Sequence, residues 1–254
     1  MDYSTVDTLT AQLRALGVRR GAVVLVHSSY KSLGEVIGGP QAVVEALLAA
    51  AGTVVVPTHT PENSDPAGWA NPPVPAVWWE PIRREAPGFD PARTPASRWM
   101  GRLSELVRAW PGARRSDHPQ VSFAAVGPRA AAVVDGHSLT GSLGEASPLG
   151  AIYRMDGQVL LLGVGHDANT SLHLGETRQP SPPTHTAGSV VRGRGWTTWT
   201  EVDVDASDFE ALGHDFEQTG AVTLGPVGEA TGRLMSQRAA ADFATAWIPQ
   251  NRGG

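Results

Sequence analysis

Short apolar runs alternate with amphipathic segments over the first 60 residues. Residues 8–16 carry apolar side chains at helical spacing and end at Gly17, and residues 22–26 form a continuous apolar run that is typical of a buried strand. A second helix is predicted over 40–51, between Pro40 and Gly52, and a second strand over 53–56. This order predicts a parallel strand–helix–strand unit at the start of the chain.

Prolines and tryptophans interrupt this pattern between residues 57 and 99. Ten of the twenty prolines and three of the eight tryptophans fall between Pro57 and Pro95, a spacing that excludes regular elements. Loops of this length are usually either disordered or functional, and tryptophan side chains favour burial or a ligand. We therefore expect an ordered flap over 57–99, with a flexible linker as the alternative.

The alternation resumes after the flap. Helices are predicted over 100–110, 128–134, a short stretch after Pro148, 170–176, 207–218 and 228–247, and strands over 121–126, 159–164, 198–204 and 222–224. The polar, proline-rich residues 178–195 are typical of a connection. The pattern predicts an α/β fold with a single mixed sheet and flanking helices, in one domain over 1–254 that carries the 57–99 flap as an insertion.

Composition and charge narrow the possible chemistry. Twenty basic and 25 acidic residues give a net charge of -5, which favours a cationic substrate over nucleic acid or an anionic membrane. The absence of cysteine excludes disulfides, thiolate metal ligands and a cysteine nucleophile. The first twenty residues do not resemble a signal peptide, and no apolar run reaches the roughly 20 residues of a membrane span, so a cytoplasmic protein is expected.

The stretch over 159–176, VLLLGVGHDANTSLHLGE, carries the strongest functional signal. A buried strand ends in glycines, and the helix predicted after it places ligand-binding groups at the carboxyl end of the strand. Asn169, Thr170, His173 and Glu176 share one helix face. The helix dipole there favours an uncharged imidazole, the form that a general base needs. His173 could equally complete a hydrogen-bond network between helix and sheet.

An acidic strand is the second candidate. Glu201, Asp203 and Asp205 alternate with valines, so the carboxylates are expected on one strand face while the valines enter the core. Three neighbouring carboxylates repel one another unless a protonated histidine, an arginine or a cationic ligand compensates their charge. The alternative is that this face of the strand is simply exposed to solvent. A carboxylate on one ring nitrogen fixes the tautomer of a histidine and stabilises its protonated form, so pairing with His173 is the simplest use of this strand.

Residues 27–34, HSSYKSLG, follow the first predicted strand. Their hydroxyls, the sole lysine and glycine-freed amides could cradle a phosphate or pyrophosphate, although the segment could also be an ordinary turn. It matches neither the P-loop nor the dinucleotide-binding fingerprint. The chain also lacks G-x-S-x-G and H-E-x-x-H, and its eight histidines show no zinc-site spacing, so no catalytic metal is expected.

The chain resembles the aminoglycoside 3-N-acetyltransferases in six segments that occur in order over most of residues 20–220. They are HSSYKSLG from 27, NSDPAGWANPPVPAVWW from 63, FDPARTPASRWMG from 89, RRSDHPQVSFAAVG from 114, GEASPLGAIY from 144 and LLGVGHDANTSLHLGE from 161. The resemblance implies an antibiotic acetyltransferase fold, acetyl-CoA as cosubstrate and the 3-amine of a deoxystreptamine aminoglycoside as acceptor. The family's usual H-L-A-E appears here with Gly175, which could loosen the helix by about 1 kcal/mol.

The resemblance also implies roles for individual residues. His173 is the expected general base, with Asp203 as the first and Glu201 as the second choice for its carboxylate partner. Acetyl-CoA is expected to lie along residues 27–34 and near Thr94 of the flap. The aminoglycoside is expected to lie among carboxylates, with the flap closing over it. The residues expected to bind CoA are His27, Ser28, Ser29, Lys31, Ser32, Gly34 and Thr94, and those expected to bind the sugar are Asp167, Glu176, Asp205 and Trp69.

Other possibilities stay open at this point. The enzyme could acetylate another amine, such as a biosynthetic intermediate, or the protein could be a non-catalytic or hydrolytic one that only binds CoA or a similar nucleotide. The expected partners are small molecules, without nucleic acid or membrane, and a homodimer is possible. Most of the remaining histidines are expected to be structural, namely His118, His137, His166 and His185.

Overall fold

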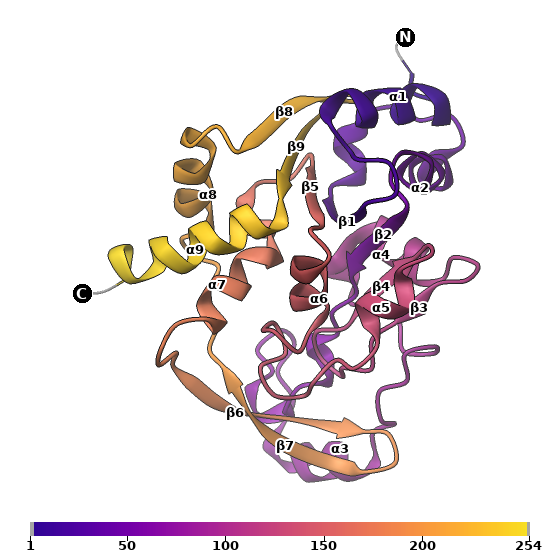
Figure 1. The fold of residues 1–254 in the computed structure, drawn as a ribbon. Coiled ribbons are helices and arrows are strands. Elements are labelled where there is room, and N and C mark those ends of the chain that lie inside the picture. Colours follow the sequence, from indigo (N-terminus) through magenta and orange to yellow (C-terminus); the bar gives the residue numbers. More distant parts are fainter. Residues whose placement is uncertain (1–2, 253–254) are drawn as a thin grey trace.

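The computed structural model describes residues 3–252 (Figure 1). Its strands are β1 (Val23–Ser28), β2 (Thr53–Pro57), β3 (Arg114–Arg115), β4 (Phe123–Val126), β5 (Gln158–Leu162), β6 (Thr184–Val191), β7 (Gly195–Val202), β8 (Val222–Val227) and β9 (Ala230–Ser236). Seven of them form one sheet in the order β3–β4–β2–β1–β5–β9–β8, whereas β6 and β7 form a separate hairpin. The predicted mixed sheet is therefore confirmed, with an additional hairpin beside it.

The helices of residues 3–252 pack mainly around this sheet. They are α1 (Val6–Leu16), α2 (Gly39–Ala50), α3 (Trp79–Glu85), α4 (Gly101–Arg108), α5 (Ala130–Val134), α6 (Pro148–Arg154), α7 (His173–Thr177), α8 (Phe209–Gln218) and α9 (Gln237–Asn251). Short 3-10 helices include η1 (Tyr30–Leu33), η3 (Pro66–Gly68), η5 (Arg98–Met100) and η7 (Thr170–Leu172). No helix within 3–252 is long and apolar enough to cross a membrane.

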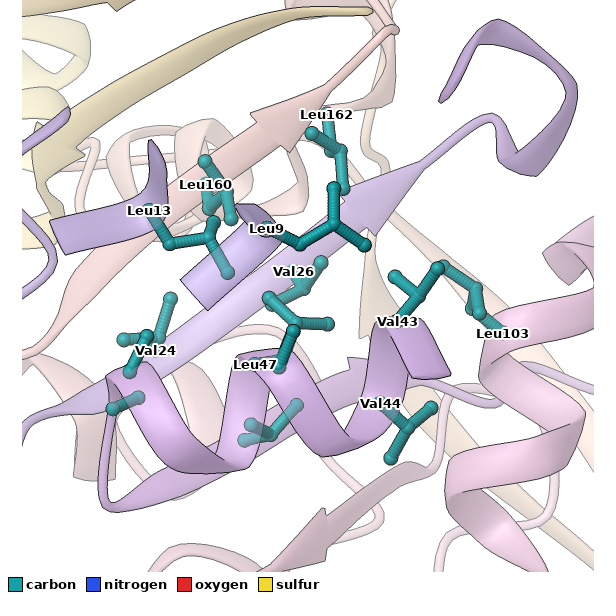
Figure 2. Close-up of a cluster of buried hydrophobic side chains, with 14 of the residues drawn as sticks. Leu9, Leu13, Val24, Val26, Val43, Val44, Leu47, Leu103, Leu160 and Leu162 are labelled. Carbon is teal, nitrogen blue, oxygen red and sulfur yellow. The ribbon is translucent and has the colours of Figure 1, made fainter. Parts of the chain in front are cut away.

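The centre of the sheet is buried on both faces, which explains its continuous apolar runs. Strands β2, β1 and β5 are parallel neighbours, and the strands outside them pair antiparallel. Side chains of α1 and α2, such as Leu13 and Leu47, pack against Val24 and Leu160 on one face (Figure 2). Apolar side chains of α5, α6, α8 and α9 cover the other face. The carboxyl ends of the three parallel strands consequently share one edge.

Three strands, β3, β6 and β9, were not predicted. The helix predicted over 228–247 is wrong in its first part, because Gly228 turns the chain from β8 into β9 before α9 begins. Ala230 and Gly232 are buried between more exposed neighbours, as expected for a strand, and Leu234 and Met235 enter the cores on opposite faces of the sheet. The predicted connection over 178–195 likewise contains β6, and the strand predicted over 198–204 is β7 of the separate hairpin.

Residues 57–99 pack against this hairpin, with α3 next to β6 and β7 at the lower end of Figure 1. The Ser189 hydroxyl donates to the Asn63 carbonyl at 2.6 Å, and the Arg83 guanidinium lies 5.3 Å from the Trp196 ring centre. The predicted absence of regular elements is wrong at α3. Its Pro81 stands in the first helical turn, where a backbone N–H has no partner within the helix.

Gly175 lets α7 approach α9 closely. A Cβ atom at this position would lie 2.6 Å from the Ala244 Cβ and 2.8 Å from the Thr245 nitrogen. Helix propensity alone predicts that Gly175→Ala stabilises the protein by about 1 kcal/mol, but we expect destabilisation by about 1–3 kcal/mol through overpacking. Urea denaturation would measure it, with Gly68→Ala as the control, because a Cβ there meets nothing within 4 Å. Equal or greater stability of Gly175→Ala would contradict the close packing.

Candidate active site

Three histidines gather where the parallel strands end. His27 is the fifth residue of β1, His59 lies two residues beyond β2, and His173 begins α7 after the loop that follows β5. The Thr170 hydroxyl lies 3.2 Å from the Nε2 of His27. The order β2–β1–β5 thus brings together residues that are distant in the chain, at the edge where open α/β sheets place their ligands.

Two of these imidazoles are uncharged at neutral pH. Burial lowers the pKa of His27 to about 3, and the nearby ring of His173 adds to this effect. Burial also lowers the pKa of His59 to about 3, again with a contribution from His173. The Nε2 of His59 is buried and has no hydrogen-bond partner within residues 3–252. Buried polar atoms are normally paired, so this nitrogen is an exception within the cluster.

His173 is paired with Glu176, one helical turn further along. The His173 Nδ1 lies 2.5 Å from the Glu176 Oε2, and the two side chains are 12% and 4% exposed. The other oxygen of Glu176 accepts hydrogen bonds from Arg252 and from the backbone N–H of Asp205, the latter at 2.9 Å. With Nδ1 donating to a carboxylate, the Nε2 of His173 carries the free lone pair. The helix face shared by these two residues is as predicted.

The predicted pairing of His173 with Asp203 or Glu201 is wrong. Asp203 accepts a hydrogen bond from His185, and both side chains are half exposed. Glu201 accepts from the Ser142 N–H at 3.1 Å and from the Trp199 indole at 3.2 Å. The physical reason is that β7 ends at Val202 and belongs to the separate hairpin, so no single strand presents the three acidic residues.

The carboxylates predicted to surround a sugar do not form one group. Both oxygens of Glu176 are engaged. The Asp205 carboxylate accepts from the N–H and the hydroxyl of Ser207, and Val204 beside it is 41% exposed instead of buried in the core. Asp167 lies against Glu210 at the surface, and partial desolvation together with this second carboxyl raises the pKa of Asp167.

The predicted CoA-binding segment, residues 27–34, consists of the end of a strand and a short 3-10 helix instead of an open loop. His27 and Ser28 belong to β1, and η1 follows after Ser29. The Ser32 hydroxyl donates to the Ser29 carbonyl at 2.7 Å, so it closes the local turn. The other residues predicted to bind CoA lie in different surroundings. Lys31 is exposed, and Gly34 lies against Glu229. The hydroxyl of Thr94 accepts a hydrogen bond from the Asp90 N–H at 3.0 Å.

A cavity of about 730 Å³ lies beside this segment, between the start of α2 and the η5–α4 region; its lining includes Pro40, Gln41, Ser97, Arg98, Gly101 and Arg102. The Ser97 N–H donates to the His59 carbonyl at 2.8 Å. A Cβ added to Gly101 would lie 3.9 Å from the Ser28 carbonyl. One wall of the cavity therefore adjoins the strand ends that carry His27 and His59.

A second cavity of about 340 Å³ lies within the flap, lined by Glu62, Trp69 and Trp99 among others. The Ser97 hydroxyl donates to the Glu62 Oε1 at 2.5 Å, so the two cavities share a wall. Sequence reasoning included Trp69 but missed Glu62 and Ser97. Among residues 3–252, no group of three or more histidine or acidic side chains could hold a metal ion.

Comparisons with known proteins identify the family of this chain. A family model described as aminoglycoside 3-N-acetyltransferase matches residues 25–249. The chain is 41% identical over 253 residues to the SPbeta prophage-derived aminoglycoside N(3')-acetyltransferase-like protein YokD of Bacillus subtilis (strain 168), over 97% of this chain and 93% of that protein. The crystal structure of YokD superposes with a TM-score of 0.96 and covers 100% of this chain and 96% of that one, at 39% identity.

Two further relatives extend the comparison. Aminoglycoside N(3)-acetyltransferase IX of Micromonospora chalcea is 34% identical over 262 residues, which cover 93% of this chain and 90% of that protein. A structure described as AAC-IIIb binary with CoASH superposes with a TM-score of 0.86 at 29% identity, over 98% of this chain and 97% of that one. These matches show that the chain belongs to the aminoglycoside 3-N-acetyltransferase family of acyltransferases.

Proposed function

We propose that this protein transfers the acetyl group of acetyl-CoA to the 3-amine of a deoxystreptamine aminoglycoside, with His173 as the general base. The observation that carries the proposal is the His173–Glu176 pair at the end of the parallel strands. The larger cavity adjoins the same edge of the sheet, because the N–H of its lining residue Ser97 donates to the His59 carbonyl. Family membership supports the reaction class, and the relative that holds CoASH supports the donor.

In the proposed reaction, the amine nitrogen attacks the thioester carbonyl carbon, and the new C–N bond replaces the C–S bond. The proton that the nitrogen loses passes to the Nε2 of His173 and then to the departing sulfur, which leaves as the free thiol of CoA. Glu176 keeps the ring in one orientation and stabilises its transient positive charge. No acyl-enzyme is needed.

The larger cavity suits the donor. Its volume of about 730 Å³ lies in the range of pockets for cofactor-sized ligands, and the exposed side chains of Arg98 and Arg102 supply positive charge for phosphates. The flap cavity suits the acceptor, because Trp69 offers an aromatic face and Glu62 a carboxylate to a polycationic sugar.

Removal of the two cavity arginines is expected to weaken donor binding. In the Arg98→Gln/Arg102→Gln double variant, the KM for acetyl-CoA should rise about tenfold while kcat changes little, because phosphate contacts act equally on ground and transition states. Steady-state kinetics would measure both constants. Arg84→Gln is the control, since exposed Arg84 pairs only with neighbouring Glu85. An unchanged KM would place the phosphates elsewhere, such as along residues 27–34.

A thiol-release assay tests the proposed function itself. Purified protein is given acetyl-CoA and kanamycin-, gentamicin- or apramycin-type acceptors, each beside a form with its 3-amine blocked. Release of CoA thiol only with the free 3-amine supports the proposal. Equal release with the blocked forms would mean that another amine is acetylated, and no release with any acceptor would contradict an aminoglycoside acetyltransferase.

A further inference from the structure

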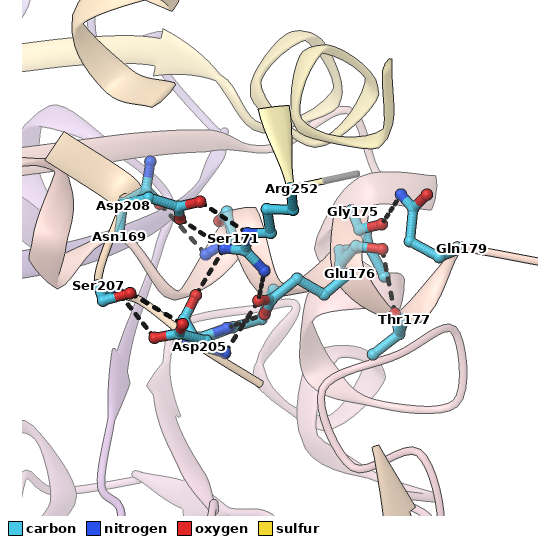
Figure 3. Close-up of polar contacts among 12 residues, drawn as sticks. Asn169, Ser171, Gly175, Glu176, Thr177, Gln179, Asp205, Ser207, Asp208 and Arg252 are labelled. Atoms are coloured by element: carbon cyan, nitrogen blue, oxygen red, sulfur yellow. Dashed lines mark hydrogen bonds and ion pairs between the residues drawn. The ribbon is translucent and has the colours of Figure 1, made fainter. Parts of the chain in front are cut away.

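Arg252, directly after α9, reaches the carboxylate that holds His173 (Figure 3). Its Nη1 donates to the Glu176 Oε1, and its Nη2 donates to the Asp205 carbonyl at 2.7 Å. The Nε and Nη2 atoms bind both oxygens of Asp208, at 2.7 and 2.5 Å. One guanidinium therefore joins Glu176 to the segment between the hairpin and α8.

The two carboxylate oxygens of Glu176 have different partners. Oε1 is held by Arg252 and by the Asp205 N–H, whereas Oε2 faces the Nδ1 of His173. The ring of Phe209 lies against both partners, with its centre 4.8 Å from the His173 ring and 5.8 Å from the Arg252 Cζ. A carboxylate fixed at one oxygen can turn only slightly, which fixes the direction of its bond to His173.

The charges of this cluster also matter for proton uptake. Glu176 and Asp208 carry two negative charges against one positive charge on Arg252, so protonation of His173 makes this group of four neutral. The other titratable groups that face His173 are the exposed carboxylate of Asp205 and the uncharged rings of His27 and His59. Loss of the Arg252 charge would therefore favour the protonated form of His173.

We propose that Arg252 is a positioning residue for catalysis, which directs Glu176 toward His173 and limits the protonation of His173 before the amine arrives. This inference rests on the proposed function, in which His173 must be unprotonated to accept a proton. A residue with a purely structural role would hold α9 in place but would leave the pH dependence of turnover unchanged.

Kinetics of Arg252→Gln as a function of pH test this role. We expect kcat at pH 7 to fall about tenfold with KM values nearly unchanged, and the acidic limb of the kcat profile to move up by about one pH unit. Arg252→Lys keeps the positive charge, so the acidic limb of its kcat profile should lie close to that of the unchanged protein. Arg238→Gln is the matched control on α9, because this guanidinium donates to the carbonyls of Tyr153 and Arg154 instead.

A second variant, expected to shift the acidic limb of the kcat profile in the opposite direction, keeps the proposal testable if Arg252→Gln folds poorly. Asp208→Asn removes one negative charge beside Arg252, so its acidic limb should move to lower pH. Loss of activity in Arg252→Gln with an unmoved limb, together with no downward shift in Asp208→Asn, would overturn the proposal and leave Arg252 a structural role.

A readout without turnover separates this inference from the proposed function. Imidazole NMR titration of the ligand-free protein, with the His173 signal assigned from His173→Gln, should show that the ring takes up its proton at higher pH in Arg252→Gln than in the unchanged protein. Coincident titration curves would refute the role of Arg252. If the thiol-release assay fails while the curves differ, the proposed function is wrong but the coupling between Arg252 and His173 stands.

Discussion

Replacement of His173 by alanine is expected to lower kcat for acetyl transfer by about 10²- to 10⁴-fold, the usual contribution of a general base. The Nε2 that accepts the proton is lost, whereas the cavity assigned to the donor is not lined by this side chain. CoA affinity should therefore remain within about threefold of its original value. Thiol release gives kcat, and isothermal titration calorimetry gives the affinity for CoA.

The structure supplies a matched control for this variant. His185 and Asp203 form a second histidine–carboxylate pair, but both side chains are half exposed, so His185→Ala should retain full activity. Glu176→Gln should lose much of kcat, while Asp203→Asn should not. Full activity of His173→Ala would exclude it as the base, and a strong effect of Asp203→Asn with none of Glu176→Gln would reverse the assignment of the carboxylate partner.

A steep loss of stability is expected below pH 6.5. Burial lowers the pKa of His27, His59 and His118 to about 3 and that of His137 to about 4, against about 6.5 in the unfolded chain. Between these values the unfolded chain binds more protons, so this stability is present above pH 6.5 and is lost as the pH falls. At pH 5 each ring costs about 2 kcal/mol, and the four together about 8 kcal/mol, which approaches a typical total stability.

Urea denaturation between pH 8 and 5 would measure this loss, in a range where most carboxylates do not yet titrate. His118 provides the sharpest variant, because its Nδ1 accepts from the N–H groups of Gln120 and Val121 and so must stay unprotonated. His118→Asn keeps an acceptor near that position but cannot titrate, and it should remove about 1.4 kcal/mol per pH unit from the slope. A wild-type stability that is flat down to pH 5 would contradict the buried neutral rings.

The sequence pattern was sufficient to predict the strands at whose carboxyl ends the candidate site lies. The apolar runs of β1 and β5 are long and bounded by glycine or polar residues, so the positions of His27 and His173 followed from periodicity alone. The β9 strand was missed because its residues and those of α9 have similar local preferences. It forms because its backbone pairs with β5. This pairing joins segments that are distant in the chain, so the local sequence does not reveal it.

The charge partners of His173 were harder to predict for the same reason. Glu176 stands on the same helix face, but the choice between it and the acidic residues 201–205 depends on where β7 lies, and β7 is outside the main sheet. The contribution of Arg252 depends on how α9 crosses α7 at Gly175. His59 could have been found from the parallel pairing of β1 and β2, which places residues after both strands at one edge.

The contact between the flap and the β6–β7 hairpin has a consequence for engineering drug selectivity. The two segments are separated by more than 80 residues in the chain, yet the Ser189 hydroxyl of the hairpin donates to the Asn63 carbonyl of the flap. A chimera that takes only the flap from a homologue would break this interface. Grafting both segments together would preserve it, so we expect a folded chimera only when the flap and the hairpin come from the same homologue and the sheet is left unaltered.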